Sequence, residues 1–434
     1  MIRAAVTAAA IALAFPAFAE VDVQQLRSPG GIDAWLVEEH SIPFVALEIA
    51  FKGGTALDPA DKQGATNLMT GLLEEGSGGW DAQGFAKARD DLAMSVNFDN
   101  WDDGVSVSTR FLTDTLDPAG DLLRTVINDP SFSGEAIERV RAQVLASIRS
   151  DGEDPQSIAG EYMAKELYGD HPYARPGDGT EETVAALTRE DIVAAWKGAM
   201  AKDRVYVSAV GDITPEQLET LLDKVLGGLP ETGAPLPGPT DLQFGGGVHV
   251  IDYPTPQAVI RFVQPGIARD DPDFFAAYVM NQVLGAGSFE SRLMDEIREK
   301  RGLTYGVAAY LSSKDQADLL AGGMATANAT VGESIDLIRQ EWAKMKESGV
   351  TQDELDRAKT YLTGAYPLRF DGNGTIANIL VGMQMDGMSP DYIATRNDKV
   401  EAVTLEDVNR VAAELLDPDK LSFVVVGQPK EALN

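Results

Sequence analysis

Cysteine is absent from all 434 residues of the sequence. Disulfide bonds therefore cannot support the fold, and a lipoprotein anchor, which requires a cysteine, is excluded. Basic residues are also scarce, since 36 Lys and Arg stand against 68 Asp and Glu, giving a formal net charge of −32. Nucleic-acid backbones are bound through clustered Lys and Arg, so we expect no nucleic-acid partner.

Several catalytic motifs are missing as well. The sequence has no Gly-x-Ser-x-Gly of a serine hydrolase and no Gly-Lys-Ser/Thr of a nucleotide-binding loop. Its three histidines, His40, His171 and His249, are too far apart in sequence for any two to share a helix. We therefore interpret each histidine as a structural or surface residue rather than a metal ligand.

The N-terminus has the pattern of a secretory signal peptide. Arg3 precedes an apolar stretch, and Ala17-Phe18-Ala19 is a small-x-small cleavage site. We predict a Sec-type signal peptide over residues 1–19, cleavage between Ala19 and Glu20, and a periplasmic location. The apolar stretch is too short to span a bilayer and no later segment approaches that length, so we expect no stable membrane insertion.

The remaining chain is an internal repeat. Three pairs of segments match in the same order at offsets of 216 to 218 residues. Each copy pairs a charged amphipathic helix with a second helix that begins at Thr188 or Thr404, and with a closing apolar strand. A threonine followed by an acidic residue three positions later is typical of a helix N-terminus. Thr351 with Glu354 has the same pattern.

The order of elements predicts the fold class. Strands such as FVALEIAFK follow one another before a helix begins, which favours an α+β unit with a mainly antiparallel sheet covered by helices. The segment LPETGAPLPGPTDLQFGGG is rich in Pro and Gly and lacks periodicity, as in an exposed linker. We predict two homologous halves, residues 20–231 and 245–434, joined by a linker at 232–244.

Two segments give the chain a family resemblance. FKGGTALDPADKQGATNLMTGLLEEGS in the first half and LGAGSFESRLMDEIREKRGLTYGVAAYL in the second are similar to segments of the pitrilysin/insulysin metallopeptidases. Within that family, the chain is similar to the non-catalytic, alpha-type subunits of mitochondrial processing peptidases. The resemblance covers nearly the whole mature chain and implies two halves that close like a clamshell around a peptide chamber.

The resemblance also locates a zinc site that this chain lacks. Active members of the family bind zinc through His-x-x-Glu-His on one helix and a distant Glu. The matching positions here hold Asn67 and Gly71 for the histidines, Thr70 for the catalytic base, and Ser147 or its neighbour Ala146 for the distant ligand. None of these residues is a good zinc ligand or carboxylate base, so we expect no catalytic residue, metal or cofactor in this chain.

The second half keeps the residues that the family uses to hold substrate. In the family, an Arg and a Tyr spaced as Arg298 and Tyr305 face the zinc and grip the peptide backbone. Arg298 is expected in the last turn of a helix that ends at Gly302, and Tyr305 at the start of a strand, on one face with Val307 and Ala309. Gly285 and Gly287 are expected to form a turn with positive φ. This turn is either purely structural or a substrate loop.

The expected function follows from this combination. The resemblance implies an inactive subunit of a periplasmic heterodimeric zinc peptidase, which binds peptide and supplies Arg298 and Tyr305 to a homologous partner that carries the zinc. Two alternatives stay open. The chain could be a non-enzymatic peptide-binding or scaffold protein of the same fold, or an enzyme that uses chemistry not evident in the sequence.

Overall fold

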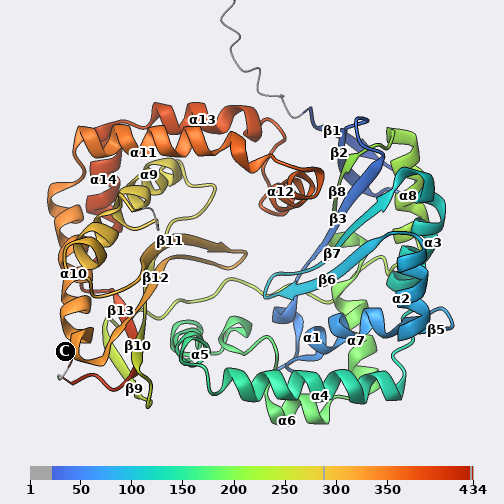
Figure 1. Ribbon diagram of the computed structural model, residues 1–434, viewed down its shortest axis with the longest axis horizontal. Coiled ribbons are helices and arrows are strands. Elements are labelled where there is room, and N and C mark those ends of the chain that lie inside the picture. The colour runs from blue at the N-terminus through green and yellow to red at the C-terminus, as the bar shows by residue number, and fades with distance from the viewer. Residues whose placement is uncertain (1–21, 287–288, 431–432, 434) are drawn as a thin grey trace, which may run out of the picture.

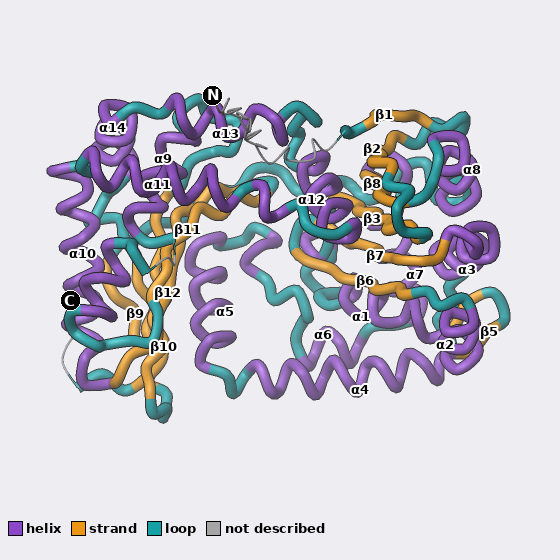
Figure 2. Tube along the Cα trace, turned by 45° about the horizontal axis from the view of Figure 1, so that its top comes forward, coloured by secondary structure: helices purple, strands orange, loops and turns teal. Residues whose placement is uncertain are grey.

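The computed structural model describes residues 22–286, 289–430 and 433. They form two α+β halves side by side, each a sheet with helices packed against it (Figures 1 and 2). The predicted fold class is confirmed. The predicted signal peptide lies outside the described residues. Among the described helices, none is long and apolar enough to cross a membrane.

The first half contains a six-stranded sheet in the order β1-β2-β8-β3-β7-β6. Its strands are β1 (Gln24–Arg27), β2 (Asp33–Glu38), β3 (Phe44–Lys52), β6 (Ser95–Trp101), β7 (Gly104–Leu112) and β8 (Val205–Gly211), with a small hairpin of β4 (Gly76–Ser77) and β5 (Trp80–Asp81) beside it. Its helices are α1 (Ala65–Leu72), α2 (Ala82–Asp91), α3 (Leu116–Asn128), α4 (Gly134–Asp151), α5 (Pro155–Tyr168), α6 (Glu181–Ala186), α7 (Arg189–Ala199) and α8 (Pro215–Leu226).

The second half contains a five-stranded sheet in the order β11-β12-β10-β13-β9. Its strands are β9 (Gly247–Asp252), β10 (Gln257–Pro265), β11 (Val307–Lys314), β12 (Ala317–Ala327) and β13 (Ser422–Gly427). Its helices are α9 (Phe274–Leu284), the π-helix η6 (Met294–Glu299), α10 (Val331–Ser348), α11 (Gln352–Ala365), α12 (Asn373–Met385), α13 (Tyr392–Ala402) and α14 (Leu405–Leu415).

Apart from the additional strand β1 in the first sheet, the two sheets share one topology. In each, a single parallel pair, β2 with β8 or β9 with β13, continues into antiparallel neighbours. The predicted helix starts are also confirmed. Thr188, Thr351 and Thr404 are the N-cap residues of α7, α11 and α14, and each forms a reciprocal capping box with the acidic residue three positions later. Equivalent side chains make equivalent contacts: Arg141 of α4 donates to the carbonyls of Val184 and Leu187 at the end of α6, and Lys359 of α11 donates to the carbonyl of Glu401 at the end of α13.

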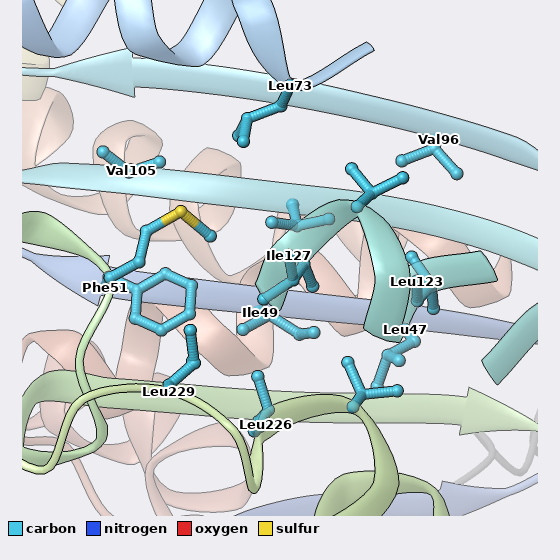
Figure 3. Close-up of a cluster of buried hydrophobic side chains, with 14 of the residues drawn as sticks. Leu47, Ile49, Phe51, Leu73, Val96, Val105, Leu123, Ile127, Leu226 and Leu229 are labelled. Carbon is cyan, nitrogen blue, oxygen red and sulfur yellow. The ribbon is translucent and has the colours of Figure 1, made fainter. Parts of the chain in front are cut away.

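The core of the first half shows why this chain folds as sheet plus helix. Strand β3 alternates, with Leu47, Ile49 and Phe51 on one face, fully buried among residues of α3 and α8 such as Ile127 and Leu226 (Figure 3). Period-two alternation places one face of a strand in the core, and the apolar faces of amphipathic helices cover it. The second sheet is covered in the same way around Trp342 and Phe262.

Packing crosses the predicted boundary between the halves in both directions. Helix α12, from the second half in sequence, packs on β3 and β8 of the first sheet through Ala377, Leu380 and Met383. Helix α5, from the first half, packs on β10 and β13 of the second sheet through Ala159. Each sheet is therefore completed by a helix from the other half. Between α8 and β9, the predicted linker contains neither helix nor strand.

Candidate functional site

Helix α1 carries the positions at which the family would bind zinc. It begins after Gly64, whose φ of +84° suits glycine. The carboxylate of Asp58 accepts hydrogen bonds from the Thr66 amide at 3.2 Å and from the Thr66 hydroxyl at 2.6 Å. Burial raises the pKa of Asp58 to about 6. Leu68 and Leu72 are buried, so the helix is fixed both at its start and along one face.

The side chains at the zinc positions are used in local contacts. The amide oxygen of Asn67 accepts a hydrogen bond from Asn100 on β6 at 3.1 Å. Thr70 is buried, and its hydroxyl donates to the Thr66 carbonyl at 2.8 Å. A Cβ atom on Gly71 would lie 3.1 Å from Cγ1 of Val140, so α1 and α4 approach closely where a zinc ligand would stand.

The distant ligand position is no better suited to zinc. Ser147 lies on the exposed side of α4, and its hydroxyl donates to Asp151 at 3.4 Å; its neighbour Ala146 is exposed too. Among the described residues, no group of three or more His, Cys, Asp or Glu side chains is arranged to hold a metal ion. The residues present at this site therefore do not fit a catalytic zinc ion.

The three histidines lie on separate elements and contact protein groups. His40 bridges Asp212 at 2.7 Å and Glu38 at 3.2 Å, and these hydrogen bonds raise its pKa. His171 stands at the start of a short helix, where Nδ1 accepts from the Tyr173 amide. The ring of His249 lies 4.8 Å from that of Tyr162. These contacts agree with the structural roles that we expected for the histidines.

Arg298 lies in the π-helix η6, partly exposed, as the sequence predicted for the end of a helix. Its guanidinium lies 4.5 Å from the ring centroid of Phe289, and it pairs with Glu299 at 3.2 Å. Gly302, with φ of +65°, follows the helix as expected. Phe289 itself is 67% exposed. The sequence analysis did not single it out, because an isolated aromatic in a glycine-rich segment gives no periodic signal.

The strand prediction for Tyr305 was wrong. Strand β11 begins at Val307, and Tyr305 lies in the preceding bend. Val307 and Ala309 are buried, whereas Tyr305 is 89% exposed, so the three do not share a face. The reason is that Thr304 forms the turn: its hydroxyl bonds the carbonyl oxygens of Gly306 and Ala325 and accepts from the Gly306 amide. The phenol of Tyr305 thus projects into solvent.

The turn prediction for Gly285 was also wrong in its conformation. Gly285 ends α9 with φ of −164°, an extended value that any residue adopts. Glycine is needed there because of a close approach to β11: an added Cβ would lie 2.7 Å from Leu293 Cδ1 and 2.9 Å from Ala309 Cβ. The Gly285 carbonyl accepts a hydrogen bond from the Ala309 amide at 2.5 Å. Gly287 lies outside the described residues.

The two candidate segments belong to different packing units. Helix α1 packs against α4, α7 and β6 of the first half, whereas η6 packs against β11 and α10 of the second. Two family models match these two parts of the chain: the insulinase (peptidase family M16) model over residues 34–181, and the peptidase M16 inactive domain model over residues 186–362. The chain belongs to the insulinase, or M16, family.

The chain is similar both to proteins named as peptidases and to one named as a non-peptidase homolog. The non-peptidase homolog YmxG of Helicobacter pylori is 27% identical, covering 91% of each chain. An uncharacterized zinc protease of Streptomyces coelicolor is also 27% identical, covering 94% of this chain and 90% of the relative. A probable mitochondrial-processing peptidase subunit beta of Schizosaccharomyces pombe is 24% identical over 87% of this chain and 85% of its own length.

Solved structures confirm the M16 fold. A peptidase M16 inactive domain from Pseudomonas fluorescens superposes with a TM-score of 0.87 at 29% identity, covering 95% of this chain and all of that one. A protease from Helicobacter pylori superposes with a TM-score of 0.85 at 16% identity, covering 94% and 99%. Together with the residues at the zinc positions, these matches identify the chain as an inactive-type M16 homologue.

Proposed function

We propose that this chain is the non-catalytic subunit of a periplasmic M16 peptidase, and that it places Arg298 and Tyr305 beside the zinc of a homologous active partner. The observation that carries the proposal is the contrast between the two segments. The zinc positions of α1 are closed by packing and by the Asn67–Asn100 hydrogen bond. By contrast, Tyr305 is 89% exposed and the side chain of Arg298 is 30% exposed.

The chemistry of these two side chains fits peptide hydrolysis. A guanidinium offers fixed donors to a peptide carbonyl, and a phenol can donate to the oxygen on which negative charge develops. The ring of Phe289 contacts the guanidinium of Arg298 on one side and restricts its motion. Less side-chain entropy is therefore lost when Arg298 binds a peptide. Among the described residues, β6 and β11 are edge strands of their sheets, so an extended peptide can add to either as a further strand.

The periplasmic location rests on the signal-peptide pattern of residues 1–19. In that compartment the partner would be a second exported M16 chain with an intact His-x-x-Glu-His motif. Zinc bound there would activate the attacking water, while this chain would bind and orient the peptide. The alternative, a scaffold of the same fold, is favoured by the same missing ligands but gives no reason for an exposed Tyr305.

The test is reconstitution with such a partner. The chain alone should cleave no peptide, and mixing should raise the partner's kcat/KM. Arg298→Ala and Tyr305→Phe should each lower kcat/KM of the complex by roughly 100-fold, the scale for loss of one donor at a developing oxyanion. Assembly, followed by analytical ultracentrifugation, should not change.

Matched controls are available nearby. Arg301 is paired with Glu296, and Tyr361 is 55% exposed on α11. Arg301→Ala and Tyr361→Phe should leave kcat/KM within about twofold, the range of a surface change of about 0.5 kcal/mol. Full activity of both Arg298→Ala and Tyr305→Phe would refute the assigned role, and assembly without any stimulation would favour the scaffold.

A further inference from the structure

A cavity of about 760 Å³ lies where the two halves meet. Its walls come from the β6–β7 turn of the first half and from the β11–β12 turn, the β10–α9 loop and the α12–α13 loop of the second. Figure 1 shows the β6–β7 and β11–β12 hairpins, whose turns line this cavity, pointing toward each other below α12. The volume lies in the range of small-molecule sites in proteins.

One wall is fixed by contacts between the hairpin tips. Lys314 pairs with Asp102, and the Asp315 amide donates to Asp103 at 3.2 Å. Lys52 pairs with Asp315 at 3.2 Å. These two ion pairs and the hydrogen bond cross the junction between the halves, so the wall is preformed and both halves are needed to build it.

The opposite wall carries a cation of a different kind. The guanidinium of Arg269 lies 4.5 Å from the Phe274 ring centroid and 5.6 Å from that of Tyr392, and its Nη2 donates to the Tyr392 hydroxyl at 2.9 Å. Lys399 lies over the rings of Phe275 and Tyr392. Among the described residues, neither cation forms an ion pair with a carboxylate, although the chain has 68 acidic residues. A guanidinium held flat by aromatic rings is ready to bind a planar carboxylate.

A carboxylate faces the same cavity. Asp386, at the end of α12, lines it close to Arg269, and within the described part of the chain it forms no ion pair. Burial raises the pKa of Asp386, while the charges of Arg269 and Lys52 act in the opposite sense. Met385, Met388 and Tyr392 give the cavity an apolar surface between these charges. The cavity thus presents opposite charges on a partly apolar wall.

We propose that this cavity binds short zwitterionic peptides. The C-terminal carboxylate lies on Arg269, supported by Lys399, and the N-terminal ammonium lies at Asp386. Because the walls come from both halves, a bound peptide joins them. The inference is independent of the role of Arg298 and Tyr305, and neither of those residues lines the cavity.

The experiment is isothermal titration of the whole chain with trialanine, with trialanine amide and with N-acetyl-trialanine. Trialanine should bind, and both blocked peptides should bind at least 10-fold more weakly. Arg269→Gln and Lys399→Gln should each weaken trialanine binding, with the larger effect, at least 10-fold, for Arg269→Gln. Arg149→Gln, at a 61% exposed arginine of α4 outside the cavity, should change nothing.

Asp386→Asn supplies the decisive comparison. It should weaken trialanine to the affinity of N-acetyl-trialanine and leave the acetylated peptide unaffected, because only the free ammonium uses that carboxylate. Thermal unfolding of each variant confirms that it is folded, and Lys399→Gln keeps the Arg269–Tyr392 contact if Arg269→Gln does not fold. Equal affinity for free and blocked peptides, or no binding of trialanine at millimolar concentration, overturns the proposal.

Discussion

The central strands of the two sheets, β3 and β10, occupy equivalent places and yet carry opposite charges at one equivalent position. Glu48 on β3 lies opposite Ser208 and Ser108, and Arg261 on β10 lies opposite Val424 and Gly323, the same register in the same topology. Their alternate residues form the two cores. On the other face each strand is covered by the exchanged helix, α12 over β3 and α5 over β10.

The difference between β3 and β10 indicates which features of the repeated unit are shared by the two halves and which have diverged. Both halves keep the alternating apolar residues of their central strand and the threonine caps of their helices, because losing either feature would reduce the stability of that half. Polar positions on the exchanged-helix face have diverged in charge. The same holds for the candidate sites, since the first half has closed its zinc positions while the second exposes Arg298 and Tyr305.

The largest expected effect comes from separating the halves. Fragments divided within the linker 232–244 should each fail to unfold cooperatively, because each sheet would lose a covering helix: Ala377, Leu380 and Met383 from the first sheet, Ala159 from the second. Circular dichroism melts would show this. Mixing the two fragments should restore a cooperative transition, and a fragment that unfolds cooperatively alone would contradict the mutual dependence.

A second test uses the buried charge on β3. Burial raises the pKa of Glu48 to about 7, although the Ser108 hydroxyl donates to it at 2.6 Å. Between its unfolded pKa and about 7, the folded protein holds a proton that the unfolded chain has lost, so stability falls as pH rises through this window and is level above it. Glu48→Gln should remove this slope and raise the free energy of unfolding at pH 8 by up to about 3 kcal/mol.

Urea unfolding at several pH values measures the effect of Glu48→Gln. Glu135→Gln on α4, where the side chain is 94% exposed, serves as the matched control and should leave the slope in place. A pH profile unchanged by Glu48→Gln would mean that other groups set the slope.

The smallest expected effect tests whether equivalent helix caps contribute equally to the stability of the two halves. Thr188→Ala and Thr404→Ala remove equivalent capping boxes from α7 and α14. Each should lower the free energy of unfolding by about 1 kcal/mol, and the two losses should agree within about 0.5 kcal/mol. Denaturant midpoints at constant m-value measure both. Clearly unequal losses would show that the equivalent helices contribute differently to the two cores.

Much of the fold could be read from the sequence because it depends on local signals. The three threonine caps and the alternation of β3 are properties of nearby residues, and the offset between the copies is found by comparing the sequence with itself. The errors occurred where a distant segment decides the conformation. Tyr305 was assigned to a strand because its neighbours alternate, but Thr304 bonds Ala325 on β12 and forms a bend. Gly285 was assigned a positive φ, whereas its requirement is the proximity of Ala309.

The sequence by itself determined the duplicated α+β architecture, the family resemblance and the absence of zinc-binding side chains at Asn67, Thr70 and Gly71, because periodicity and residue type suffice for these. Only the tertiary structure decided that α5 and α12 exchange sheets, that Tyr305 stands exposed while Thr70 is buried, and that Arg269 and Asp386 line the same cavity. The physical reason is that exposure and ion pairing depend on which distant surfaces meet, and a local pattern carries no information about that.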